Sequence, residues 1–297
     1  MRGILPMLRC WIEAMRLRTL PVSVAGVIVG TACAIMMGSF SAVPAVVCML
    51  FAVLAQISSN FGNEYYDFEN GVDRKGREGF RRGVTEGEIS PKAMKSATFV
   101  TLSAAAVVGC MMTLFGPWWL LLVCALVVVA ALAYSAGPYP LSHHGLGDVA
   151  VVLFFGIVPV TVTCYLQTGS WECLGIALPA SVATGLLAAN VLVVNNYRDM
   201  EDDAAVGKRT TVVLFGRKVM GVVYLLSGFV AMAIMYPVWV RLPLWAMATP
   251  CIYIVLHVAT WLAIVRSKGA ALNPLLGRTA VNLFLFALMF ILCSLLA

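Results

Sequence analysis

Charged side chains are scarce in this sequence. Asp, Glu, Lys and Arg make up 11% of its 297 residues, whereas 61% of the residues are hydrophobic. Soluble domains carry about 25% charged residues, and a chain with so few charges cannot cover a water-exposed surface. The composition therefore excludes a soluble globular protein. Most of the chain must face the lipid bilayer or pack inside a helical bundle.

The nine cysteines also lack any pattern that would serve a metal site or a disulfide framework. There is no CxxC pair, and most of the thiols lie inside apolar runs, where cysteine behaves as a small hydrophobic residue. We expect neither zinc nor disulfides. We also expect no cleavable signal peptide, because the N-terminal arginines are not followed by a short apolar core and a small-residue cleavage site. No nucleic-acid partner is expected.

Long apolar runs dominate the chain instead. A membrane-spanning helix needs about 20 apolar residues. Nine such helices are predicted, over 21–40, 42–66, 93–114, 118–135, 146–165, 174–199, 219–240, 243–265 and 279–296. We predict an all-α membrane protein with a single integral-membrane domain over 1–297. The order of helix, acidic cluster, basic loop and helix occurs twice, which predicts two similar halves of about 1–140 and 141–297.

The placement of basic residues predicts the orientation in the membrane. If the N-terminus is cytoplasmic, the inside segments are 1–20, 67–92, 136–146, 199–218 and 266–278. Of the 20 Lys and Arg residues, 19 lie in or next to these segments, and only Arg241 lies outside them. This bias agrees with the positive-inside rule. Thirteen of the 14 acidic residues lie near the same side, which suits a site that binds a metal and an anion together.

Amides and carboxylates gather at the end of the second apolar run. Asn60, Asn63, Glu64 and Asp67 are three or four residues apart, so on a helix they share one face. Asp73 breaks this register, but the Asn-Gly pair before it is a turn signal, and it predicts that Asp73 folds back towards Asp67. A carboxylate at the edge of a bilayer is costly, so it normally has a partner or a function.

A second cluster follows the sixth apolar run. Asn195, Asp199 and Asp203 come at intervals of four and stay on one stripe of a helix. Carboxylate and amide oxygens suit Mg²⁺, which binds a few carboxylates together with water and substrate phosphate. Two such clusters facing a cavity would hold Mg²⁺ against a diphosphate through Asp67, Asp73, Asp199 and Asp203.

Basic residues beside both clusters fit an anion. Arg grips phosphate oxygens in bidentate fashion, and Lys supplies a point charge. The candidates for binding a diphosphate are Arg82, Arg198, Lys208 and Arg209. The apolar bundle would hold the rest of the substrate. A diphosphate that carries a long hydrocarbon tail is a polyprenyl diphosphate.

At these residues the sequence resembles the UbiA-type membrane prenyltransferases, whose two Asp-rich motifs run approximately NxxxDxxxD. Asn195, Asp199 and Asp203 match the second motif, whereas the last Asp of the first motif comes later, at Asp73. That longer spacing is similar to the branch that acts on 1,4-dihydroxy-2-naphthoate in menaquinone synthesis. Glu64 departs from the family, which commonly has Asp there. Other stretches that resemble this branch lie at 11–21, 82–90, 145–148, 207–210 and 272–276.

The resemblance implies nine transmembrane helices around a central cavity, with the active site facing the cytoplasm from the inner membrane. It implies Mg²⁺-dependent transfer of a polyprenyl group to an aromatic acid, 1,4-dihydroxy-2-naphthoate, with loss of CO₂ to give demethylmenaquinone. Mg²⁺ and the basic residues would stabilise the departing diphosphate. Further candidate residues are Asn60, Glu64, Arg16, Arg18 and Tyr134, with the two arginines assigned to the carboxylate of the acceptor.

Two alternatives remain at this point. An ion-coupled transporter also carries intramembrane carboxylates, but these should lie near mid-membrane between broken helices, and here they gather at one face. Within the same chemistry, the acceptor could be another aromatic acid, such as 4-hydroxybenzoate or homogentisate. His143 and His144 are interpreted as loop residues rather than metal ligands, because nothing near them in the sequence completes a site.

Overall fold

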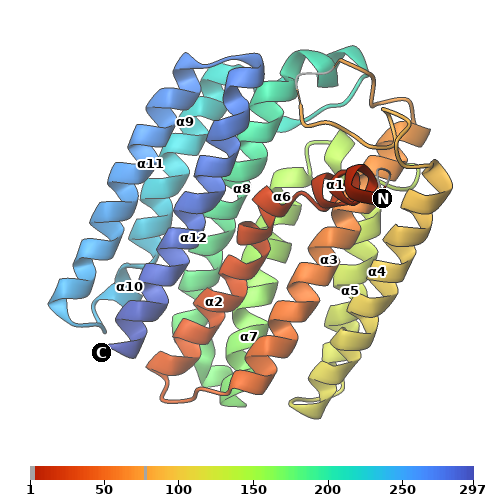
Figure 1. Ribbon diagram of the computed structural model, residues 1–297. Helices are drawn as coiled ribbons and strands as arrows, with labels where there is room; N and C mark the ends of the chain where they lie inside the picture. Colours follow the sequence, from red (N-terminus) through yellow and green to blue (C-terminus); the bar gives the residue numbers. More distant parts are fainter. Residues whose placement is uncertain (1–3, 77–78) are drawn as a thin grey trace.

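The computed structural model describes residues 4–76 and 79–297, and every regular element within them is helical (Figure 1). Arg2, Arg77 and Glu78, which the predicted orientation counts among the inside charges, lie outside this part. The helices are α1 (Ile4–Met15), α2 (Leu20–Met36), α3 (Ala42–Glu69), α4 (Pro91–Met111), α5 (Leu120–Ala133), α6 (Gly147–Val151), α7 (Val158–Thr168), α8 (Leu174–Ala205), α9 (Thr211–Ile234), α10 (Tyr236–Trp239), α11 (Ala248–Arg266) and α12 (Asn273–Leu295).

The bundle has the dimensions of a multi-pass membrane protein. Eight helical stretches in the described residues are long and apolar enough to cross a bilayer, and the shorter apolar helix α5 runs beside them (Figure 1). The all-α membrane fold predicted from the sequence is thus confirmed, while the count of nine crossings stays a prediction. Helix α1 lies near one end of the bundle, and α12 finishes near the other (Figure 1).

The second long inside loop is much shorter than the sequence predicts. Helix α8 does not end near Asp199 but continues to Ala205. Helix α9 begins at Thr211, with a break at Gly216 (φ +78°), where a loop was expected up to 218. The reason is local, because the Asn-Asp stripe has helical spacing and Thr210 caps the next helix by accepting a hydrogen bond from the Val213 amide. The second cluster therefore lies wholly on a helix.

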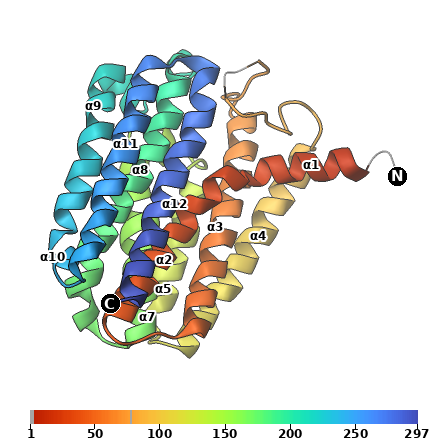
Figure 2. The same ribbon diagram turned by 60° about the vertical axis from the view of Figure 1, so that its left-hand side comes forward.

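Helix α1 lies across the end of the bundle rather than along it (Figure 2). Its Trp11 ring meets Phe61 of α3 edge-on, with ring centroids 5.6 Å apart. The next residue after α1 is Arg16, the one residue other than glycine with positive φ (52°) in the part of the chain described here. This left-handed backbone is uncommon for a residue with a Cβ, and such strain gathers at functional sites.

Glycines bring α8 against the π-helical turn Val152–Ile157, which joins α6 to α7. A Cβ on Gly185 would lie 2.7 Å from the carbonyl oxygen of Val152, and a Cβ on Gly156 would overlap the backbone of Gly185. Small residues allow such close approach between membrane helices. The contact fixes α6, at one wall of the site, against α8, which carries the second cluster.

Candidate functional site

A cleft of about 1220 Å³ opens where the predicted clusters lie, between α3, α6 and α8. Ten of the fifteen predicted site residues line it: Asn60, Asn63, Asp67, Arg16, Arg82, Tyr134, Asn195, Arg198, Asp199 and Lys208. The structure thus brings together two clusters that are far apart in the sequence. The cleft wall also contains polar and apolar residues that were given no site role from the sequence, among them Phe80, Asp148 and Thr211.

Asn63 is the centre of the first cluster. Its Oδ1 accepts hydrogen bonds from Arg16 Nη2 at 2.7 Å and from Arg82 Nη2 at 3.1 Å. Its Nδ2 donates to Asp67 Oδ2 at 2.9 Å and to Ser135 Oγ at 3.0 Å. One buried amide therefore uses all four of its bonding positions and holds two guanidinium groups beside a carboxylate.

Asp73 folds back towards Asp67 as the turn signal predicts. Gly71 has φ +67°, and the Asp73 amide donates to the Asp67 carbonyl oxygen at 3.2 Å. Arg82 then lies between the two carboxylates, with Nε 3.2 Å from Asp73 Oδ2 and Nη2 3.6 Å from Asp67 Oδ2. All three side chains are buried, so the first cluster is a charge network of low solvent access.

Arg198 organises the second cluster on α8. Its Nε and Nη2 donate to the two oxygens of Asp199 at 2.6 and 2.7 Å, in the bidentate geometry of strong Arg–carboxylate pairs. Nη2 also donates to Asn195 Oδ1, and Nη1 donates to Asn273 Oδ1 on α12, each at 2.8 Å. The third acidic residue, Asp203, is buried and lies 3.6 Å from Lys208 Nζ.

The other predicted residues lie beside the cleft rather than in its wall. Glu64 accepts a hydrogen bond from the Val84 amide at 3.0 Å, so it holds the loop that carries Arg82. Arg209 is exposed, and its amide donates to the His143 carbonyl oxygen at 2.9 Å. Their predicted contact with metal or diphosphate stays a prediction.

Phe80 lines the cleft, and its ring contacts two arginines. Its ring centroid is 5.1 Å from the Arg18 guanidinium carbon and 5.2 Å from that of Arg198. Cations over an aromatic face are attracted by its quadrupole. Phe80 thus contacts Arg198 of the second cluster. It also contacts Arg18, which the sequence analysis assigns to the acceptor.

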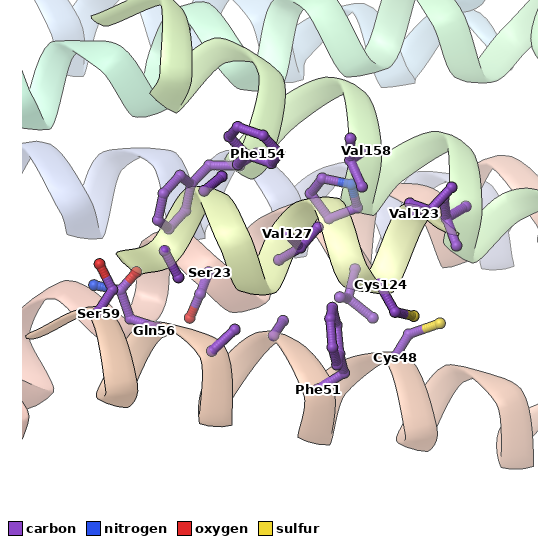
Figure 3. Close-up of a pocket in the computed structure, with 18 of the residues that line it drawn as sticks. Ser23, Cys48, Phe51, Gln56, Ser59, Val123, Cys124, Val127, Phe154 and Val158 are labelled. Atoms are coloured by element: carbon purple, nitrogen blue, oxygen red, sulfur yellow. The ribbon is translucent and has the colours of Figure 1, made fainter. Parts of the chain in front are cut away.

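An apolar cavity of about 940 Å³ continues the cleft into the bundle, between α2, α3, α5 and α7. In the close-up, Gln56 and Ser59 lie at one end, and Phe51, Cys48 and Cys124 lie towards the other (Figure 3). Five residues line both spaces: Gln56, Ser59, Tyr134, Val151 and Phe155. The charged cleft and the apolar cavity therefore meet at these residues.

The four aspartates assigned to Mg²⁺ do not converge on one point. Among the residues that the structure describes, no three acidic, His or Cys side chains are close enough to hold a metal ion. Each aspartate instead has a basic neighbour, because carboxylates at this density repel one another unless cations lie between them. The donor set still fits a hard cation, since Asp67 Oδ1 is buried and accepts no hydrogen bond from the described residues.

Two residues near the first cluster were given no site role from the sequence. His143 places Nε2 3.9 Å from Asp67 Oδ1, although it belongs to a short connection between α5 and α6. Ser135, at the end of α5, accepts the bond from Asn63. Neither residue belongs to a motif. Their proximity depends on how α5 packs beside α3, and no local spacing signals that packing.

Replacing Asn63 with leucine should disable the first cluster. Arg16, Arg82, Asp67 and Ser135 would each lose a hydrogen bond in a buried place, and each loss of this kind costs about 1–3 kcal/mol. We expect a lower thermal midpoint in detergent and at least a roughly 100-fold loss of activity, as when a preorganised polar contact is removed. Leucine at the exposed Glu69, at the end of the same helix, is the control. If the Asn63 variant had the same melting temperature and turnover as the wild-type protein, Asn63 would not be the centre of the first cluster.

Comparison with known proteins identifies the family. Residues 23–292 match the model of the UbiA prenyltransferase family. Relatives named 1,4-dihydroxy-2-naphthoate octaprenyltransferase include one from Escherichia coli K12, 39% identical over 214 residues, covering 70% of this chain and 69% of the relative. Another, from Haemophilus influenzae, is 37% identical over 217 residues, covering 70% of each chain.

Solved structures show the same fold. A UbiA homolog from Aeropyrum pernix K1 matches with a TM-score of 0.72 at 14% identity, covering 91% of this chain and 97% of that chain. A UbiA homolog from Archaeoglobus fulgidus bound to GPP and Mg²⁺ matches with a TM-score of 0.66 at 18% identity, covering 94% and 99%. With helical architecture, paired clusters and sequence in agreement, this chain belongs to the UbiA prenyltransferase family.

Proposed function

We propose that this protein transfers a polyprenyl group from polyprenyl diphosphate to 1,4-dihydroxy-2-naphthoate, with loss of CO₂, in menaquinone biosynthesis. The observation that carries this proposal is the continuity of a charged cleft with an apolar cavity at Tyr134. A substrate with an anionic head and a hydrocarbon tail matches both parts. The naphthoate acceptor is supported by the names of the relatives from several bacteria.

The charge balance of the cleft supports a divalent cation as cofactor. Arg16, Arg82, Arg198 and Lys208 line it with four positive charges, against the carboxylates of Asp67, Asp148 and Asp199. One excess positive charge is too little for a diphosphate, which carries several negative charges. Mg²⁺, when bound, supplies the missing charge and acts as a Lewis acid on the phosphate oxygens. Asp67 and Asp199, supported by Asp73 and Asp203, are the residues proposed to hold it.

The chain's own residues would then bind and orient the diphosphate. Arg82 and Arg198 each present several N–H donors from buried positions, and Lys208 adds a charge. Such preorganised donors stabilise the charge that develops on the leaving group. The walls beyond Tyr134, built from Val127, Phe154 and Val158, exclude water from the allylic carbon as it becomes cationic (Figure 3).

We place the protein in the bacterial cytoplasmic membrane with the cleft facing the cytoplasm. The charge bias supports this orientation, because the cleft is at the end of the bundle that carries nearly all basic residues. In this placement both substrates meet at the membrane surface, where an amphipathic diphosphate and an aromatic acid partition.

The proposal is tested with purified protein in lipid vesicles, a labelled polyprenyl diphosphate and three acids: 1,4-dihydroxy-2-naphthoate, 4-hydroxybenzoate and homogentisate. We expect a prenylated product with the naphthoate, no turnover after EDTA, and recovery when Mg²⁺ is added back. Preference for another acid would assign the protein to that acceptor. Turnover that survives EDTA would contradict the cation requirement derived from the charge balance.

A further inference from the structure

Asp148 is the one carboxylate in the cleft wall that belongs to neither Asp-rich cluster. It lies in the first turn of α6, directly after Gly147. Its position in the wall depends on the close packing of the π-helical turn against α8, since α6 continues into that turn. The diphosphate-binding role proposed for the two clusters does not use this residue.

The two oxygens of Asp148 have different surroundings. Oδ2 accepts a hydrogen bond from Thr211 Oγ1 at 2.6 Å, whereas Oδ1 is buried and has no hydrogen-bond partner among the described residues. Leaving a buried carboxylate oxygen unsatisfied is costly, and native proteins rarely do so without a reason. An oxygen of this kind in the wall of a substrate cleft indicates that a ligand supplies the missing donor.

Asp148 also differs from the cluster aspartates in having no basic partner. Asp67, Asp73, Asp199 and Asp203 each face an Arg or Lys side chain. No ion pair to Asp148 occurs within residues 4–76 and 79–297. A carboxylate bound to a guanidinium is a weak base, because the cation favours the ionised form. Asp148 keeps its capacity to accept a proton.

The position of Asp148 is also suitable relative to the reacting carbon. Tyr134 lines both the charged cleft and the apolar cavity, and its hydroxyl oxygen would lie 3.4 Å from a Cβ on Gly147. Asp148 is thus next to the border at which the diphosphate head gives way to the hydrocarbon tail. In the proposed function the allylic carbon of the donor would lie at that border, and the acceptor ring would have to reach it there.

We propose that Asp148 is a catalytic residue whose Oδ1 takes the proton of a ring hydroxyl of the aromatic acceptor. This rests on the proposed function. As the proton leaves, electron density from that oxygen moves into the ring, and the ring carbon that carries the carboxylate bonds to the allylic carbon. The allylic C–O bond breaks, and its electron pair leaves with the diphosphate. When CO₂ departs, the electron pair of its bond returns to the ring and the oxygen takes the proton back from Asp148.

Thr211 serves as the positioning residue for this step. Its hydroxyl occupies Oδ2 and leaves Oδ1 as the oxygen without a hydrogen-bond partner among the described residues. Its contribution is geometric, whereas Asp148 exchanges a proton with the substrate. The two side chains form a matched pair for testing, because Thr211→Val removes the hydrogen bond and keeps the carboxylate.

The test compares Asp148→Asn with Thr211→Val in the vesicle assay with 1,4-dihydroxy-2-naphthoate. General-base catalysis contributes about 10²–10⁴-fold, so we expect kcat of Asp148→Asn to fall by about 100-fold or more. The KM for polyprenyl diphosphate and the Mg²⁺ requirement should not rise, because the substitution removes a negative charge from the cleft. The kcat of Thr211→Val should fall much less than that of Asp148→Asn. Equal losses in the two variants, or a raised Mg²⁺ requirement in Asp148→Asn, would assign Asp148 a structural or metal-binding role and overturn the proposal.

A second pair keeps the test decisive if Asp148→Asn does not fold. The side chains introduced by Asp148→Glu and Asp148→Gln have the same shape, so the two variants share any packing defect. Only the carboxylate of the Glu variant can take a proton. We expect the Glu variant to exceed the Gln variant in kcat by about tenfold or more. Similar rates would overturn the proposal. Failure of the proposed function would look different, because wild-type protein would then give no product with the naphthoate.

Discussion

Exchanging Asp199 for asparagine should lower turnover by about 1000-fold, the upper range for losing one preorganised charge contact in an active site. The substitution keeps the shape of the side chain but replaces one carboxylate oxygen with an NH₂ group. That group would face Arg198, which now donates to both oxygens. Both the charge offered to Mg²⁺ and the orientation of the arginine would be lost. Release of labelled diphosphate in vesicles measures the effect.

Asp202→Asn is the matched control for this prediction. It changes the same residue type on the same helix, three residues away, where Asp202 pairs with Arg74 at the surface. Exposed pairs contribute about 0–1 kcal/mol, so the control should fold and turn over normally. Asp67→Asn should behave like Asp199→Asn, because it removes the matching charge from α3. If Asp199→Asn kept wild-type activity, Asp199 would have no part in binding the metal or the diphosphate.

The second large effect is expected from a single methyl group. In Gly185→Ala the new Cβ would meet the Val152 carbonyl oxygen at 2.7 Å and the Val152 Cα at 3.0 Å, and neither backbone atom can rotate away. Overpacking of this kind costs about 1–3 kcal/mol in well-packed interiors. The π-helical turn would have to shift, and α6 with it. We expect a lower melting temperature and a clear loss of activity.

Gly175→Ala is the control, because it lies on the same helix and a Cβ there would meet nothing within 4 Å. Alanine favours a helix over glycine by roughly 1 kcal/mol, so this variant should be unchanged or slightly more stable. The comparison separates a crowding effect from a general change in helix propensity. A Gly185→Ala protein as stable as Gly175→Ala would show that α8 and the turn can separate without cost.

Local sequence patterns were sufficient for the apolar helices and the two clusters, but not for α1, which lies in a segment where no helix was predicted. The spacing of Asn63 and Asp67 predicted that both lie on one face of α3. The Asn-Gly turn before Asp73 predicted that the chain folds back and brings Asp73 near Asp67. Hydropathy located the apolar helices, because a chain in lipid must pair its backbone N–H and C=O groups internally, and a helix does so. The end of α8 was misplaced since an acidic helix end looks like a loop. The predicted similarity of the two halves stays a prediction.

Contacts between distant segments could not be predicted in the same way. Phe80 lies between Arg18 and Arg198, and His143 lies beside Asp67, only because the connections fold over the cleft. Asp148 sits in a Gly-rich stretch with no partner at helical spacing. Its proposed role rests on an unsatisfied oxygen, and such an atom is a property of packing. A single sequence carries no local signal for it.

The ion pairs within the cleft have a thermodynamic consequence. Arg82 and Arg198 are now held by Asp67, Asp73 and Asp199. If these residues bind the diphosphate and a cation as proposed, an arginine that turned to a phosphate oxygen would expose a carboxylate, and a carboxylate that turned to the cation would free an arginine. Each ligand would thus remove a group that competes with the other. Linkage would then require that each raises the affinity for the other by the same factor, so we expect the head group and the cation to bind, and leave, as one unit.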